Sequence, residues 1–190
     1  MTDEEQKELN EKLIEVCRFS WGLKTPNRAA AEVIKELIDK GADINYQTEN
    51  GFSPLIVGIS WHNHDVVEYL LKNGANVDLQ DASGWTSLIH SIFGDDIKNM
   101  KIILQYGANV DLQDISGKSA INYATTFHVL HSHPKGVEKA LYKLQLLEDH
   151  IEKKKLLLVQ KRLALGKLFY SYLGKDLVEE GLYEKISSFF

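Results

Sequence analysis

The sequence has little cysteine and proline and lacks a long apolar run. Its single cysteine, Cys17, has no second cysteine with which to form an internal disulfide, which favours a reducing compartment. No apolar run approaches the roughly 18 residues that span a bilayer. The acidic start, Met1–Glu5, is unlike a secretory signal. We therefore expect a cytoplasmic protein, working in a host cytosol if it is a secreted effector without such a signal.

Basic charge is scarce over most of the chain. Residues 1–134 contain 11 Lys and Arg against 19 Asp and Glu, whereas residues 135–190 contain 11 against 8, and the net charge is -5. An acidic body is not expected to bind nucleic acid over its whole surface, because such binding usually needs a basic face. The basic end favours either packing against the acidic body or an anionic partner.

Signatures of catalysis are also missing. The sequence contains no phosphate-binding G-x-x-x-x-G-K-[ST] loop and no evident set of acid, base and nucleophile. His128, His131 and His133 have a spacing that zinc ligands can adopt, but no fourth ligand accompanies them and the segment is typical of a polar loop. We interpret His62 and His64 as structural. The prediction is a protein that is not an enzyme, with no cofactor, no metal and no small-molecule substrate.

The sequence does contain an internal repeat of 33 residues. The motif Gly41–Gln47 recurs at Gly74–Gln80 and again at Gly107–Gln113. A second motif, Asn50–Leu55, recurs twice with the same step. Chance rarely preserves the spacing and the chemistry of two separate motifs over three copies, so the chain is predicted to be an array of stacked units.

Each repeat predicts a short first helix. Ser53, Thr86 and Ser119 occupy the position where a hydroxyl group accepts a hydrogen bond from a free amide at a helix start. Pro54 follows at the first helical position, where its missing N–H costs nothing.

A second helix follows in each repeat. Asn63, or Asp95 with Asp96, precedes apolar residues at helical spacing, as in Val66, Val67, Leu70 and Leu71. Gly74 and Gly107 then stand where a helix ends in a left-handed residue. The polar stretches 41–52, 74–85 and 107–118 are predicted to be projecting hairpins.

This pattern resembles the ankyrin-repeat family, with its Thr-Pro-Leu-His helix start and its Gly-Ala-Asx hairpin. The resemblance covers residues 41–127 and implies an all-α ankyrin-repeat solenoid, built of helix-turn-helix units with β-hairpin loops. The family's histidine, which helps to tie hairpins together, is replaced by Ile56, Ile89 and Asn122. We therefore expect these repeats to depend more on apolar packing.

The array is expected to occupy residues 1–134 and to have atypical ends. It divides into a diverged N-terminal cap repeat at 1–48, repeats at 49–81 and 82–114, and a partial repeat at 115–134. The cap is predicted to contain a helix over 3–18 and a second helix starting at Pro26. The apolar face of the first helix contains Leu9, Leu13 or Ile14, Val16 and Cys17, and that of the second contains Val33, Ile34, Leu37 and Ile38.

Residues 135–190 depart from the repeat and are predicted to be a C-terminal helical extension. Leu141, Leu144 and Leu147 are expected to cover the open end of the last repeat, where Ala124 needs a neighbour.

The family resemblance implies a protein-protein interaction module: an adaptor, scaffold, inhibitor or effector. Partners of ankyrin repeats usually contact the hairpin tips and the outward residues of the first helices, which line a concave surface. At those positions this chain has several aromatic residues, whose exposure is costly unless a partner covers them. The predicted partner-binding residues are Phe52, Trp61, Trp85, Phe93 and Phe127, with Glu49, Asn50, Ser83 and Lys118, and Tyr106 before a hairpin.

Two alternatives remain open from the sequence. In the first, the chain's own C-terminal extension fills the concave groove in place of a partner. In the second, the repeats are a scaffold and a basic amphipathic helix of the extension makes the functional contact. Residues 153–167 contain lysine, arginine and leucine without any acid, a composition that suits an anionic membrane or nucleic acid.

Overall fold

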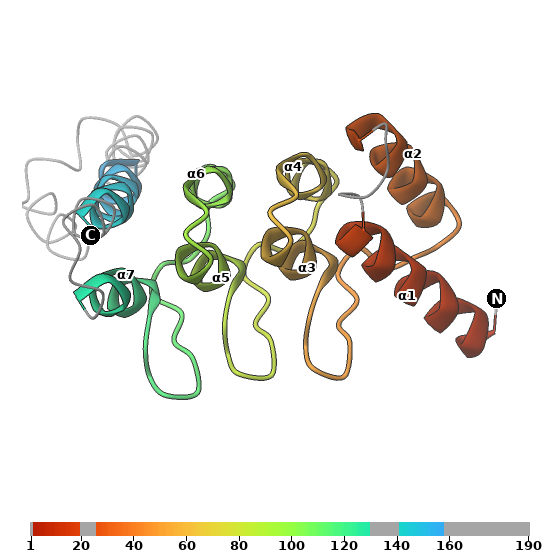
Figure 1. The fold of residues 1–190 in the computed structure, drawn as a ribbon, viewed down its shortest axis with the longest axis horizontal. Helices are drawn as coiled ribbons and strands as arrows, with labels where there is room; N and C mark the ends of the chain where they lie inside the picture. Colours follow the sequence, from red (N-terminus) through yellow and green to blue (C-terminus); the bar gives the residue numbers. More distant parts are fainter. Residues whose placement is uncertain (1, 20–25, 130–140, 158–190) are drawn as a thin grey trace, which may run out of the picture. The chain divides into compact units, whose positions relative to one another are not determined.

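A computed structural model describes residues 2–19, 26–129 and 141–157, and the chain divides into two compact units, Met1–Leu147 and Glu148–Phe190. The first six named helices of the first unit pack in three consecutive pairs (Figure 1). Residues 141–157 are also helical, and the first seven of them belong to the first unit. The named helices are α1 (Asp3–Phe19), α2 (Pro26–Asp39), α3 (Pro54–Ser60), α4 (His64–Lys72), α5 (Ser87–Phe93), α6 (Ile97–Gln105) and α7 (Ala120–Val129).

The helices of the first unit form two rows. Helices α1, α3, α5 and α7 pack side by side in one row, and α2, α4 and α6 pack in the other. The connecting hairpins project from the first row, away from the second (Figure 1). This arrangement confirms the predicted all-α repeat solenoid, and the helix over 141–157 confirms that a C-terminal helix follows it.

The first helices begin at the predicted hydroxyl residues, with one difference. Ser53 Oγ accepts the amide of Ile56 at 3.2 Å, and Thr86 Oγ1 accepts the amide of Ile89 at 3.3 Å. Ser119 instead donates its hydroxyl to Asn122 Oδ1 at 3.0 Å. Asn122 stands where the other two repeats have an isoleucine, so its carbonyl competes for that hydroxyl.

The starts and ends of the second helices depend on Asp96 and on glycine. Asp96 Oδ1 accepts the amide of Asn99 at 3.0 Å and caps α6, whereas the side chain of Asn63 makes no such bond to α4. Gly74 and Gly107 have φ of 90° and 84°, the left-handed conformation predicted for them.

The apolar core runs between the two rows. Ile56 and Ile89, which replace the family's histidine, are completely buried, as are Leu13 and Cys17 of α1. Burial also raises the pKa of the Cys17 thiol, so this cysteine packs as a neutral apolar group. Val33 does not follow the prediction. It is 40% exposed, because its position on α2 turns away from the face that carries Ile34 and Leu37.

Neighbouring hairpins are tied together by a glutamine ladder, formed by Gln47, Gln80 and Gln113. The amide nitrogen of Gln47 donates to Gly51 O in its own hairpin and to Gln80 O in the next, both at 2.8 Å. Gln80 repeats the pattern with Gly84 O at 2.7 Å and Gln113 O at 2.9 Å. Glutamine thus supplies hydrogen bonds between hairpins in addition to the apolar packing expected of these repeats.

A second set of hydrogen bonds joins the bases of the hairpins. Asn45 Oδ1 accepts the amide of Asn76 at 2.7 Å, and Asp78 Oδ1 accepts the amide of Asn109 at 2.8 Å. For the first hairpin the acceptor is Asn10 of α1, which lies 2.7 Å from the amide nitrogen of Asp43. Helix α1 thus supplies the side-chain oxygen that a preceding hairpin would supply, as an N-terminal cap must.

The segment 141–147 is buried on a different face from the one predicted. Leu147 is completely buried, but Leu141 is 61% exposed and the second fully buried side chain is Lys143. Residues 143 and 147 are four apart and so share one helix face, whereas residue 141 lies on another. The expectation that Leu141 covers the last repeat is wrong.

Hairpin stacking can be tested with two glycines that share a backbone conformation. A Cβ atom on Gly84 (φ 78°) would lie 2.8 Å from Cα of Asp114 in the next hairpin, whereas one on Gly117 (φ 74°) would meet only the Gln113 side chain at 3.9 Å. We expect Gly117→Ala to cost about 1 kcal/mol of stability from backbone strain alone. Gly84→Ala should cost more, because a neighbouring backbone must move. Urea denaturation measures both, and equal losses would contradict close hairpin packing.

Candidate functional site

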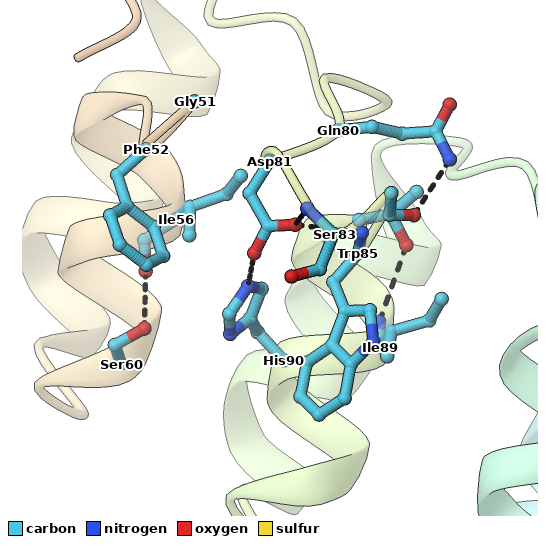
Figure 2. A network of polar contacts seen from close by, with 12 residues as sticks. Gly51, Phe52, Ile56, Ser60, Gln80, Asp81, Ser83, Trp85, Ile89 and His90 are labelled. Carbon is cyan, nitrogen blue, oxygen red and sulfur yellow. Dashed lines mark hydrogen bonds and ion pairs between the residues drawn. The ribbon is translucent and has the colours of Figure 1, made fainter. Parts of the chain in front are cut away.

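Ring side chains from three successive repeats form a continuous aromatic row, defined as Phe52, His90, Trp85 and Tyr123. Phe52 precedes α3, Trp85 precedes α5 and His90 lies within it, and Tyr123 belongs to α7. The ring centroid of His90 lies 6.0 Å from Phe52 and 5.3 Å from Trp85, and Trp85 lies 5.1 Å from Tyr123. The imidazole therefore bridges two repeats (Figure 2).

The Asp81 carboxylate positions the centre of this row. Its Oδ1 accepts the amides of Ser83 at 2.8 Å and Trp85 at 2.9 Å, which fixes the hairpin turn. Its Oδ2 lies 2.8 Å from His90 Nε2 (Figure 2). The Asp81 side chain is only 7% exposed, so these bonds satisfy a buried charge as well as orienting two rings.

The next repeat contains the same arrangement. Asp114 Oδ1 accepts the amides of Ser116 at 2.8 Å and Lys118 at 2.9 Å, and its Oδ2 accepts the hydroxyl of Tyr123. In the first repeat Thr48 takes this position, and its hydroxyl accepts the amide of Phe52 at 3.1 Å. The sequence-based prediction omitted Asp81, Asp114, His90 and Tyr123. The signal was present in the recurrence of an aspartate nine residues before a ring in two repeats.

Burial and hydrogen bonding shift the pKa values of two rings of the row, His90 and Tyr123, and of Asp114 beside it. Burial lowers the pKa of His90, which the neighbouring Asp81 opposes in part, so the neutral imidazole donates to that carboxylate at neutral pH. The hydroxyl of Tyr123 is the largest of the causes that lower the pKa of Asp114. Burial, followed by the bond to Asp114, raises the pKa of Tyr123. These three directions all favour neutral rings beside an ionised Asp114 at neutral pH.

The predicted partner-binding residues divide into exposed and supporting side chains. Trp61 is 48% exposed and Phe93 is 44% exposed, at the C-terminal ends of α3 and α5. Phe52 and Trp85 are half-buried, and the Trp85 ring lies 4.9 Å from Phe93. The other predicted residues of the hairpins are exposed, namely Glu49, Asn50, Ser83 and Lys118.

Two predicted site residues do not join this group. Tyr106 is 39% exposed, but it ends α6 in the second row. The backbone of Phe127 belongs to α7, whereas its side chain lies outside the described residues.

His62 and His64 both contact Asp96, the cap of α6. The ring nitrogens lie 2.7 Å and 3.0 Å from its carboxylate oxygens. Burial by itself would raise the pKa of Asp96. The hydrogen bonds from the Asn99 amide and the two histidines together outweigh burial, and the pKa is lowered. These histidines connect successive repeats, which agrees with their predicted structural role.

The remaining sequence-based hypotheses concern regions that are only partly described. Among the described side chains, no group of three His, Cys, Asp or Glu residues could hold a metal ion. His131 and His133 lie outside them, as do residues 158–167 of the basic segment. In the described part of the chain, every helix is too short or too polar to cross a membrane.

Comparison with known proteins identifies the repeat. Residues 25–114 match the family model of ankyrin repeats in three copies, so the chain belongs to the ankyrin-repeat family over this range. Ankyrin repeats are generally protein-protein interaction modules and typically non-catalytic scaffolds. A search of curated proteins finds no match to the chain.

The bond between Tyr123 and Asp114 should make stability depend on pH. The pKa of Asp114 is lower in the folded than in the unfolded state, so its ionised form stabilises the fold. This contribution to the free energy of unfolding is fully present above the unfolded-state pKa of about 4, and it is lost as the pH falls through the folded-state pKa. Tyr123→Phe removes the hydroxyl but keeps the ring. We expect this variant to melt at a lower temperature than wild type at pH 7, and the difference to shrink below about pH 4.

Tyr69→Phe is the control, because the structure shows no hydrogen bond to the Tyr69 hydroxyl among the described residues. Thermal melting between pH 3 and pH 8 gives the comparison. A Tyr123→Phe difference that stays constant down to pH 3 would count against the pairing.

Proposed function

We propose that the chain binds a partner protein through an aromatic surface made of Trp61, Phe93 and the aromatic row. The observation that carries this proposal is the exposure of Trp61 and Phe93, 48% and 44%, at the ends of neighbouring first helices. Such side chains supply large binding energies when a partner buries them. Their neighbourhood on the repeat side that partners of ankyrin repeats commonly use supports this function.

The surface is pre-organised for binding. Trp85 contacts Phe93, His90 and Tyr123 by its ring, and its backbone amide is held by Asp81. A ring that is already fixed loses little conformational entropy on association. More of the free energy gained by burying it therefore appears as binding affinity. Trp61 and Phe93 then act as anchors, and the aromatic row acts as their rigid base.

The polar rim supports an orientation for the partner. Glu49 belongs to the first hairpin and Lys118 to the third, and both are exposed. Charges at a rim affect the association rate and the register of a complex more than its affinity. A partner segment that runs along the row is therefore expected to place a basic group near Glu49 and an acidic group near Lys118.

The other function considered from the sequence uses the second unit. Lys153, Lys154 and Lys155 are exposed there beside Leu156 and Leu157, which are 59% and 50% exposed. This combination suits an anionic membrane. We favour the aromatic surface because hydrogen bonds and ring contacts build it from three repeats.

Substitution of the two anchors tests the proposal. A partner is first captured with the full chain, identified by mass spectrometry and purified. Calorimetry should then show that Trp61→Ala and Phe93→Ala each weaken binding by about 1–3 kcal/mol, the range of interface anchors. Both variants should fold normally. Trp85→Ala should weaken binding and also lower the melting temperature, because its ring contacts three others.

Tyr106→Ala is the matched control, since this residue is similarly exposed (39%) but lies in the second row. It should bind the partner like wild type. If Trp61→Ala and Phe93→Ala retain wild-type affinity, or if Tyr106→Ala alone loses it, the partner binds elsewhere.

A further inference from the structure

The side chain of Lys143 is completely buried. Its Nζ lies 2.8 Å from the carbonyl oxygen of Ile92 and 2.8 Å from Oδ1 of Asp95. A buried ammonium group is costly unless it is paired and hydrogen-bonded, and here both conditions are met. The contact joins residues 51 positions apart, so it depends on the fold of the repeats.

The two groups that receive this ammonium form a preformed lysine pocket, defined as the Ile92 carbonyl and the Asp95 carboxylate. Ile92 lies in the last turn of α5, where the carbonyl ends of the helix carry partial negative charge. Asp95 adopts φ of 57°, a left-handed conformation that is costly for a residue with a side chain. One carbonyl oxygen and one carboxylate aimed at a single point suit a primary ammonium group.

In the preceding repeat, the residue equivalent to Asp95 contacts the repeat that follows it. His62, 33 residues before Asp95, has a similar φ of 53° and reaches forward to Asp96 at 2.7 Å. In that case both partners belong to adjacent repeats. Asp95 instead receives a lysine from a segment that follows α7 only after residues 130–140. The segment 141–147 therefore behaves as a ligand tethered to the repeats.

The tethered segment contacts the repeats through more than one side chain, and the Tyr142 ring centroid lies 5.3 Å from Lys101 Nζ of α6. Lys143 and Leu147 are its fully buried residues, whereas Leu141 and Tyr142 are 61% and 44% exposed. A helix that buries one ammonium group and one leucine four residues later on a single face presents a simple pattern that a helix of another protein can reproduce. The pocket also adjoins the aromatic surface, because Phe93 directly follows Ile92.

We propose that the lysine pocket is a binding site for a lysine of a partner protein, and that Lys143 occupies it as an internal competitor until the partner displaces it. The partner segment is helical, with a lysine followed four residues later by a leucine or a similar apolar residue. This inference rests on the proposed function in one respect, which is that the ligand is a protein. It requires Asp95 and does not require Trp61.

The test uses a fluorescein-labelled peptide with the chain's own sequence 141–150, LYKLQLLEDH, titrated into the full-length protein. In the variant Lys143→Ala/Leu147→Ala the internal segment is released and the pocket is open. Fluorescence anisotropy should show that the peptide binds this variant at least tenfold more tightly than it binds wild type. A peptide with methionine at the position of Lys143 should lose this binding, and so should the wild-type peptide after Asp95→Asn is added to the variant.

Equal binding to wild type and to the released variant, or equal binding of the lysine and methionine peptides, would overturn the proposal. Adding Trp61→Ala to the released variant should leave peptide binding unchanged, so a failure of the aromatic surface is distinguishable from a failure of the pocket.

A second measurement covers the case in which the double variant does not fold, as judged by circular dichroism. In otherwise wild-type protein, Asp95→Asn should increase amide hydrogen exchange in residues 144–147 at least tenfold and leave α3 unchanged. Unchanged exchange in 144–147 would show that the ammonium does not hold the segment, and would also overturn the proposal.

Discussion

The hydrogen bonds between successive hairpins are the interaction on which the rest of the first unit depends. Gln47 and Gln80 each donate to a carbonyl of their own hairpin and to one of the next, which works only if equivalent residues are 33 positions apart. The hairpins approach so closely that Gly84 has no room for a Cβ atom. This fixed register brings the first helices side by side, and so it aligns Phe52, Trp85 and Tyr123 in one row.

Features that follow from local rules could be predicted from the sequence. Hydroxyl residues at the helix starts, left-handed glycines at the helix ends and apolar residues at helical spacing identify the paired helices and the exposed Trp61. Contacts between distant side chains could not be predicted in this way. Asp81 pairs with His90 only because the hairpin folds back on α5. A lysine in a leucine-rich helix is ordinarily solvated, so nothing local indicated that Lys143 would be buried.

The two ends of the repeat array are closed in different ways. At the N-terminal end, Asn10 of a long helix supplies the oxygen that a preceding hairpin would offer, and Leu13 and Cys17 on the same helix are completely buried. At the other end, a short segment inserts an ammonium group between α5 and the turn that follows it. The first closure is built into the core. The second includes the charge pair between Lys143 and Asp95, which suits a contact that a partner with its own lysine replaces.

Hydrogen exchange of the full-length chain, with and without its purified partner, tests the central claim most directly. If the aromatic surface of the first helices and hairpins binds the partner, added protection should appear in peptides that cover residues 48–61 and 81–94. Peptides that cover α4 and α6 should exchange as in the free protein. Protection confined to α4 and α6, or to residues 148–157 of the second unit, would contradict the account.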